Sequence, residues 1–305
     1  MAARVHVQTQ KDDVAVVLEA GDLAATFLPD AAMLGVSLRH QGVELLALPH
    51  SAAQWKQGST TGMPLLHPWA NRLGGRSYRV GDRQVRLAGV ALPVDGNNLS
   101  IHGTVRNTAF SIDTLTARAN AAVLSARLDS STDALLTRAF PFPHELTVTA
   151  QLTARTLRVT TELRPTGPAA VPIAFGFHPY FRLPAARRAV SLRLPKRTEL
   201  LLDSRNLPTG EEHECAAENK PLARRVFDTH YRLGADRRFV VAGGDRRLAV
   251  TFDAGYPHAQ VYAPARSNFV CIEPMTAPVD GLRRGQVTMV PPRGTYRAGF
   301  TVRVA

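Results

Sequence analysis

The chain has 305 residues, of which 45% are hydrophobic, and its 37 basic and 25 acidic residues give a formal net charge of +12. The basic residues are mostly arginines scattered as singles and pairs, and this dispersion argues against a nucleic-acid groove. No stretch of 18 or more apolar residues occurs and the first residues carry no signal-like apolar core, so we expect a soluble cytoplasmic protein without a membrane span.

Apolar and polar residues alternate with a period of two in many segments, which predicts β-strands. The clearest are residues 14–19, 145–152, 157–163, 190–194, 248–252 and 299–304. Glycine, proline and asparagine mark turns between them, and no segment sustains a helical apolar spacing, so we expect only short helical turns, one of them near residues 31–35. We expect residues 204–221, the longest stretch without a strand pattern, to form a surface loop.

Many short strands with turn-rich connections predict an all-β fold, a large antiparallel β-sandwich with few short helices. The composition is similar on both sides of the proline-rich residues 164–168, so we expect one domain over residues 1–305. Cys215 and Cys271 lie far apart and have neither a zinc-site spacing nor a disulfide framework, which predicts no metal. A reduced compartment fits this pattern, and a single disulfide between the two cysteines stays open from the sequence.

Two short apolar runs each end in an ionisable side chain followed by proline. Residues 175–181 read Phe-Gly-Phe-His-Pro-Tyr-Phe around His178, and residues 269–274 read Phe-Val-Cys-Ile-Glu-Pro around Glu273. If both runs are strands that end at one rim of a sheet, they bring an acid and a base together. Such a pair suits a reaction in which one proton leaves while another arrives.

Further motifs occur in a fixed order around these two: Ala-Asn-Arg at 70–72, His-Gly at 102–103 and Phe-Asp at 227–228. The ordered set resembles the aldose 1-epimerase (galactose mutarotase) family from about residue 62 to about residue 294. Departures at residues 65–69 and after Pro274 are closer to a divergent bacterial branch of that family. The resemblance implies a large antiparallel β-sandwich and a reaction without a cofactor. It also implies that His178 is the general acid, that Glu273 is the general base, and that the sugar is held by Asn71, Arg72, His102 and Asp228.

The residue types suit that chemistry. A carboxylate removes the proton of the anomeric hydroxyl while an imidazolium protonates the ring oxygen; the C1–C2 bond then rotates and the ring recloses. His178 needs its protonated form favoured, which we expect from neighbouring carboxylates. Arginine donates and aspartate accepts hydrogen bonds from sugar hydroxyls. A flat apolar surface for the pyranose is expected from Trp69, Phe177 and Tyr180.

Two other functions stay open from the sequence. The arginine excess is compatible with a hexose-6-phosphate 1-epimerase, and a non-catalytic sugar-binding protein could share the fold. We expect a small-molecule sugar as the partner and a monomer or a homodimer as the assembly state. His67 and His230 are interpreted as structural.

Overall fold

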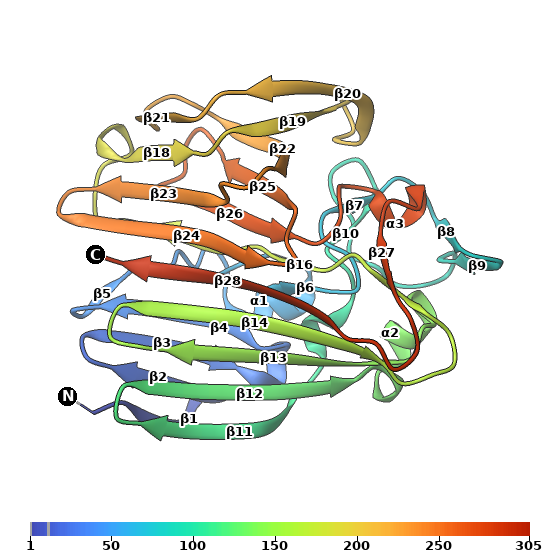
Figure 1. Ribbon diagram of the computed structural model, residues 1–305, viewed down its shortest axis with the longest axis horizontal. Coiled ribbons are helices and arrows are strands. Elements are labelled where there is room, and N and C mark those ends of the chain that lie inside the picture. Colours follow the sequence, from blue (N-terminus) through green and yellow to red (C-terminus); the bar gives the residue numbers. More distant parts are fainter. Residues whose placement is uncertain (1, 11–12) are drawn as a thin grey trace.

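A computed structural model describes residues 2–10 and 13–305 of the chain. The largest sheet of the protein forms one layer of the fold (Figure 1). The sheet is antiparallel and has nine strands, in spatial order β11 (Ser111–Arg118), β12 (Ala121–Asp129), β13 (His144–Leu152), β14 (Thr156–Pro165), β28 (Tyr296–Val304), β24 (Arg246–Ala254), β23 (Arg238–Gly243), β18 (Ser191–Leu194) and β21 (Glu218–Pro221).

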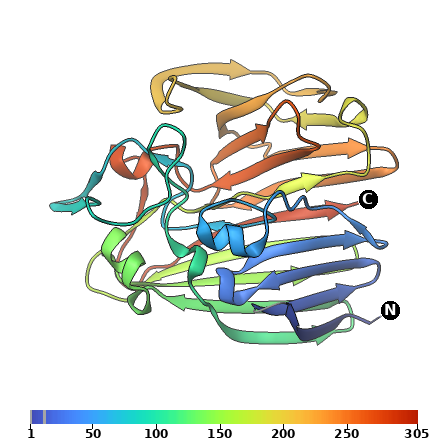
Figure 2. The same ribbon diagram turned by 180° about the vertical axis from the view of Figure 1, so that it is seen from behind.

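Two further antiparallel sheets lie behind this layer, as Figure 2 shows from the opposite side. An eight-stranded sheet contains β20 (Pro208–Cys215), β19 (Arg197–Leu202), β22 (Phe227–Leu233), β25 (His258–Ala263), β26 (Phe269–Met275), β16 (Gly176–Phe177) and β6 (Leu65–Leu66), with β17 (Tyr180–Arg182) paired to β26. A five-stranded sheet contains β1 (Arg4–Gln10), β2 (Asp13–Ala20), β3 (Leu23–Leu28), β4 (Leu34–His40) and β5 (Val43–Glu44).

Short ribbons and helices fill the connections. The ribbons pair β7 (Arg72–Leu73) with β10 (Ser100–Ile101), β8 (Ser77–Val80) with β9 (Arg83–Arg86), and β15 (Val171–Ile173) with β27 (Thr288–Val290). The α-helices are α1 (Ala52–Gln57), α2 (Ala134–Ala139) and α3 (Gly281–Arg284), and the 3-10 helices are η1 (Pro29–Ala31), η2 (Val105–Asn107), η3 (Ser130–Thr132) and η4 (Arg187–Ala189). Within the described residues, no helix is long and apolar enough to cross a membrane.

The period-two patterns of the sequence explain how the layers pack. In β12 and β13 every second residue is buried, because successive side chains of a strand point to opposite faces of the sheet. The buried apolar side chains of the sheets form one extended cluster, which includes Leu18, Val148, Phe239 and Phe300. The expected all-β fold with large antiparallel sheets is therefore confirmed.

The strand predictions mostly match the structure, with corrections at two segments. The six predicted strands fall on β2, β13, β14, β18, β24 and β28. The helical turn expected near residues 31–35 lies slightly earlier, in η1. The surface loop expected at 204–221 was wrong, because the segment contains β20 and β21. Strand β20 lies at a sheet edge with mostly exposed polar side chains, so its strand state depends on pairing with β19 and leaves no apolar alternation.

Candidate active site

Three neighbouring strands of the eight-stranded sheet carry polar side chains on one face. The register pairs Asp228 of β22 with Tyr262 of β25, and Gln260 of β25 with Glu273 of β26. Directly paired residues project from the same face, and so do residues two apart in one strand. The four side chains therefore form a contiguous polar area. Glu273 lies within β26 and not at a strand end, which corrects the position expected for it.

His178 reaches this area from the connection between β16 and β17. Its backbone N–H donates to the carbonyl oxygen of Pro64 at 3.1 Å, which fixes the chain beside β6. Its imidazole stacks on the ring of Tyr180, with centroids 4.6 Å apart and an interplanar angle of 12°. Its Nε2 atom lies 3.3 Å from Oε1 of Glu273. The structure thus brings the sequence-predicted acid and base into direct contact.

The β7–β10 ribbon presents three more of the predicted side chains. Ile101 pairs with Arg72 across the ribbon, and the N–H of His102 donates to the carbonyl oxygen of Asn71 at 2.9 Å. Asn71 and His102 both adopt left-handed backbone conformations, with φ of 57° and 63°. The imidazole of His102 meets that of His178 edge-on, with centroids 5.5 Å apart. This ribbon therefore places Asn71, Arg72 and His102 opposite the polar face of the sheet.

Gly103 holds the end of the ribbon close to the chain at His67, so Gly103→Ala is expected to destabilise the protein and displace His102. A Cβ atom at Gly103 would lie 2.1 Å from the carbonyl oxygen of His67, and its φ is 67°. We expect a loss of about 3 kcal/mol or more in the free energy of unfolding. Urea denaturation measures this loss.

Gly42→Ala is the matched control, because Gly42 has φ of 76° with no atom within 4 Å of the added Cβ. Its expected cost is the conformational strain alone, about 1 kcal/mol. Equal losses in the two variants would show that the close approach at Gly103 is unimportant.

The ribbon and the sheet enclose a cavity of about 240 Å³. This volume lies below the roughly 300–1,000 Å³ of sites for drug-sized ligands, and it suits one monosaccharide. The cavity is lined by Thr60, Asn71, Arg72, Ile101, His102, His178, Tyr180, Asp228, Gln260, Tyr262 and Glu273. Seven of the nine residues selected from the sequence are thus brought together in one hollow.

Trp69 and Phe177 do not line this cavity. Trp69 is 1% exposed and belongs to the main apolar core, and Phe177 packs against Phe300 with ring centroids 5.3 Å apart. Tyr180 lines the cavity, but its ring stacks on His178 and its hydroxyl bonds to Thr60, so it also orients the imidazole. The partly exposed ring of Tyr262 is the remaining aromatic surface of the cavity among the described residues.

The sequence interpretation missed several residues of the site. Gln260 and Tyr262 line the cavity, and Asp95 orients Arg72 by accepting a hydrogen bond from its Nε at 2.6 Å. Asp95 also accepts hydrogen bonds from the backbone N–H groups of Asn97 and Leu99. Its local sequence, Asp-Gly-Asn-Asn at residues 95–98, is typical of a turn and gives no sign of this role. The pairing of Gln260 with Glu273 depends on strand register, which no local motif specifies.

Burial favours the uncharged forms of the central pair. Burial raises the pKa of Glu273 well above its usual value, the Asp228 carboxylate raises it further, and Arg72 opposes this. Burial lowers the pKa of His178 to about 3, so desolvation outweighs the effect that we expected from neighbouring carboxylates. A neutral Glu273–His178 pair and a carboxylate–imidazolium pair contain the same number of protons. One proton shift between the two residues therefore interconverts these states.

Several polar atoms of the cavity-lining residues have no hydrogen-bond partner. They are Nδ1 of His102, Nδ1 of His178, Oε1 of Gln260 and Oε2 of Glu273. Buried polar groups are normally paired, so a cluster of unpaired ones indicates a polar ligand. Sugar hydroxyls both donate and accept hydrogen bonds and match such a mixed set.

Comparisons with known proteins agree with this architecture. The model of the aldose 1-epimerase family matches residues 32–302. A galactose mutarotase-like protein from Clostridium acetobutylicum has a TM-score of 0.88 at 18% identity, over 100% of this chain and 99% of that chain. A galactose 1-epimerase from Lactobacillus acidophilus has a TM-score of 0.79 at 15% identity, over 99% and 98%. A galactose mutarotase-like protein from Lactobacillus casei has a TM-score of 0.74 at 17% identity, over 95% and 100%.

At these identities the solved structures establish a shared fold. The family match covers most of the sequence and includes every residue of the cavity. The chain belongs to the aldose 1-epimerase family.

Proposed function

We propose that the protein is an isomerase that interconverts the α and β anomers of a free, uncharged aldose in the cavity at His178 and Glu273. The observation that carries this proposal is the contact of 3.3 Å between His178 Nε2 and Glu273 Oε1 inside a hollow of monosaccharide size. The family membership supports an isomerase acting on sugars and does not by itself identify the substrate.

In the proposed reaction, Glu273 as carboxylate accepts the proton of the C1 hydroxyl while His178 as imidazolium donates a proton to the ring oxygen. The C1–O5 bond breaks and an open-chain aldehyde forms. Rotation about C1–C2 exposes the other carbonyl face, and reclosure returns both protons. No proton enters or leaves the site overall, because Glu273 gains one proton while His178 gives one up. Ring opening thereby converts the charged Glu273–His178 pair into the neutral pair that burial favours.

The remaining lining residues suit the holding of the sugar. Arg72 is kept in place by Asp95 and by Oδ1 of Asn71, which accepts from its terminal nitrogen at 3.1 Å. Asp228 is exposed and already accepts a hydrogen bond from Nε2 of Gln260 at 2.6 Å. Tyr262 offers an aromatic face for the apolar side of a pyranose, the role first expected of Trp69.

The charges around the cavity favour an uncharged sugar over a sugar phosphate. Arg72 is the one guanidinium among the described lining residues, and its Nε is already engaged by Asp95. Asp228 and Glu273 contribute two carboxyl groups to the same lining. A phosphate is expected to need several free donors in a fork, so the hexose-6-phosphate alternative has little support from this site.

Optical rotation tests the proposal. Freshly dissolved α-anomers of glucose, galactose and other aldoses are mixed with the purified protein, and the approach to the equilibrium rotation is followed. We expect acceleration beyond the buffer rate for at least one free aldose and a slower reaction with glucose 6-phosphate. Sugar binding without acceleration would favour the non-catalytic alternative. A preference for the phosphate ester would contradict the assignment of an uncharged substrate.

Asp228→Asn is expected to shift the pH dependence of kcat/KM. The Asp228 carboxylate helps to raise the pKa of Glu273, so removal of its charge should lower that pKa. The basic limb of the profile, where the pair loses its single proton from Glu273, then moves to lower pH. KM should rise by about tenfold, because the amide replaces a charged acceptor for a sugar hydroxyl. A basic limb that moves to higher pH would contradict this electrostatic role.

A further inference from the structure

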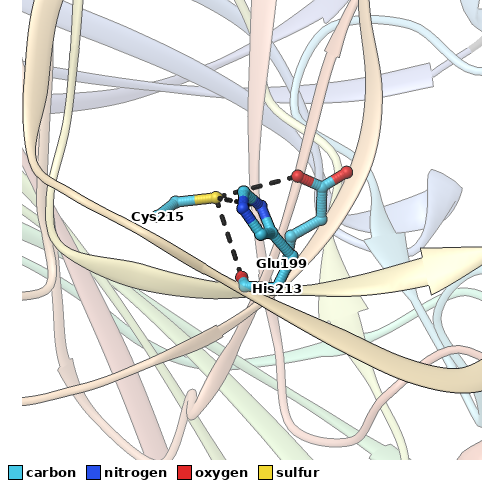
Figure 3. A group of neighbouring side chains, drawn as sticks. All are labelled: Glu199, His213 and Cys215. Carbon is cyan, nitrogen blue, oxygen red and sulfur yellow. Dashed lines mark hydrogen bonds between the residues drawn. The ribbon is translucent and has the colours of Figure 1, made fainter.

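The hairpin of β19 and β20 carries a second cluster of reactive side chains, at the edge of the eight-stranded sheet. Figure 3 shows Glu199, His213 and Cys215 converging on one another. Sγ of Cys215 lies 3.7 Å from Oε2 of Glu199 and 3.5 Å from Nδ1 of His213. One ligand atom from each of the three residues lies within 4.8 Å of the others.

Strand register explains why these side chains meet. His213 pairs directly with Glu199 across the hairpin, and Cys215 lies two residues further along β20 on the same face as His213. Glu199 in turn pairs with Tyr231 of β22, whose side chain is in the core, whereas Asp228 of β22 projects from the other face. The cluster therefore lies on the opposite face of the sheet from the sugar cavity.

Two of the three separations between ligand atoms are close to those of a tetrahedral metal centre. With zinc–sulfur bonds near 2.3 Å and zinc–nitrogen and zinc–oxygen bonds near 2.0–2.1 Å, ligand atoms of a tetrahedral site stand about 3.3–3.6 Å apart. The two distances from Sγ of Cys215 come close to these values, and the ligand atoms of Glu199 and His213 lie within 4.8 Å of each other. We propose that Glu199, His213 and Cys215 bind one Zn²⁺ ion, with a water molecule as the fourth ligand.

The ligand types suit this ion. Thiolate, imidazole and carboxylate are the three common protein ligands of zinc, and one thiolate with one carboxylate balances its two charges. Binding converts the Cys215 thiol into a thiolate and releases its proton to solvent. Because the ligands must be deprotonated to bind the ion, zinc affinity should increase with pH.

The sequence prediction of no metal site rested on the spacing of the two cysteines. In the sequence, His213 and Cys215 supply only two neighbouring ligands. The third ligand, Glu199, is brought beside them by the pairing of β19 with β20, which the sequence does not reveal. The bound ion would link β20, an edge strand with mostly exposed side chains, to β19. We therefore expect zinc to stabilise the folded protein and to leave sugar turnover unchanged.

Cobalt(II) is the direct probe, because thiolate ligation gives a charge-transfer band and tetrahedral ligation gives intense visible bands. The full-length protein is reduced, freed of metal and titrated with Co²⁺, and then with Zn²⁺ in competition. We expect one equivalent of Co²⁺ to produce both sets of bands and Zn²⁺ to displace it. Absence of the charge-transfer band in the unaltered protein would overturn the proposal.

Variants assign the ligands. Cys215→Ser should abolish the charge-transfer band even though Cys271 remains, and Glu199→Gln and His213→Asn should each weaken Zn²⁺ binding by at least about tenfold. Glu214→Gln is the matched control, since Glu214 lies between His213 and Cys215 in β20 and bonds instead to Thr198 at 2.5 Å. Retention of the band in Cys215→Ser, or equal weakening in Glu214→Gln, would contradict the assignment.

Thermal unfolding gives an independent readout. Saturating Zn²⁺ should raise Tm of the unaltered protein and of Glu214→Gln by roughly 3–6 °C, and it should leave Cys215→Ser unchanged. An equal rise in Cys215→Ser would show that zinc acts elsewhere. These measurements do not involve sugar, so their outcome is separate from the test of isomerase activity.

Discussion

Replacing Glu273 with glutamine is expected to lower kcat for anomer interconversion by about 10²–10⁴-fold. Glutamine keeps the size of the side chain and a polar terminal group, but it cannot take the proton of the C1 hydroxyl. His178 keeps its stacking on Tyr180, so the cavity should retain its shape. Exchange between anomers at equilibrium, followed by NMR magnetisation transfer, measures the rate constant directly.

Two controls accompany this variant. Glu211→Gln removes an exposed carboxylate of β20 by the same chemical change and should leave kcat unaltered. Circular dichroism and Tm should show that Glu273→Gln is folded, and Tm should be equal or higher because an ionisable group in the interior is replaced by a neutral one. Undiminished turnover in folded Glu273→Gln would mean that another group is the base.

The protein is also expected to unfold cooperatively when the pH falls from about 6.5 toward 4. Burial lowers the pKa of five histidines outside the proposed catalytic pair: His67, His102, His144, His230 and His258. The native pKa is about 4 for His144 and His258 and about 3 for His230. In the unfolded chain these groups titrate near 6.5, at roughly the value of free histidine.

Between the native and unfolded pKa values, only the unfolded chain binds these protons. Stability is therefore fully present above about pH 6.5 and decreases as the pH falls through this interval, by about 1.4 kcal/mol per proton and pH unit. Five protons give an upper limit of roughly 7 kcal/mol per pH unit. Even half of that slope would remove most of a typical stability of about 5–15 kcal/mol by about pH 4.

Urea denaturation at several pH values between 7.5 and 4.5 measures this slope. His258→Asn should reduce the slope by about 1.4 kcal/mol per pH unit, because the half-buried His258, which stacks on the buried His230 with ring centroids 5.4 Å apart, has a lowered pKa. His50→Gln is the control, since it replaces a histidine whose side chain is exposed. A free energy of unfolding that stays constant from pH 7 to pH 5 would contradict the inferred burial of neutral histidines.

Short motifs made the contact between His178 and Glu273 predictable from the sequence. His178 stands in an aromatic Gly-Phe-His-Pro-Tyr-Phe run and Glu273 in Ile-Glu-Pro, and the expected acid–base reaction requires the two side chains to meet. The fold class was predictable because β12, β13 and similar strands bury every second residue, so that packing leaves a local pattern.

The contributions that depend on strand register could not be predicted. Tyr262 and Gln260 have ordinary strand neighbours, and only the pairing of β25 with β22 and β26 places them beside Asp228 and Glu273. The sequence favours Trp69 because its flat ring suits the apolar face of a pyranose, but the isolated bridge between Trp69 and Ala174 directs this segment into the core. Register joins residues distant in sequence, and a motif reports only on its immediate neighbours.

A crystal structure of Glu273→Gln with a bound monosaccharide tests the central claim most directly, because the variant should bind the sugar without turning it over. We expect one pyranose in the cavity, with the C1 hydroxyl about 2.6–3.2 Å from the side chain at position 273 and the ring oxygen at a similar distance from His178. A sugar bound elsewhere, or one in this cavity whose C1 and ring oxygen face away from both side chains, would contradict the proposed mechanism.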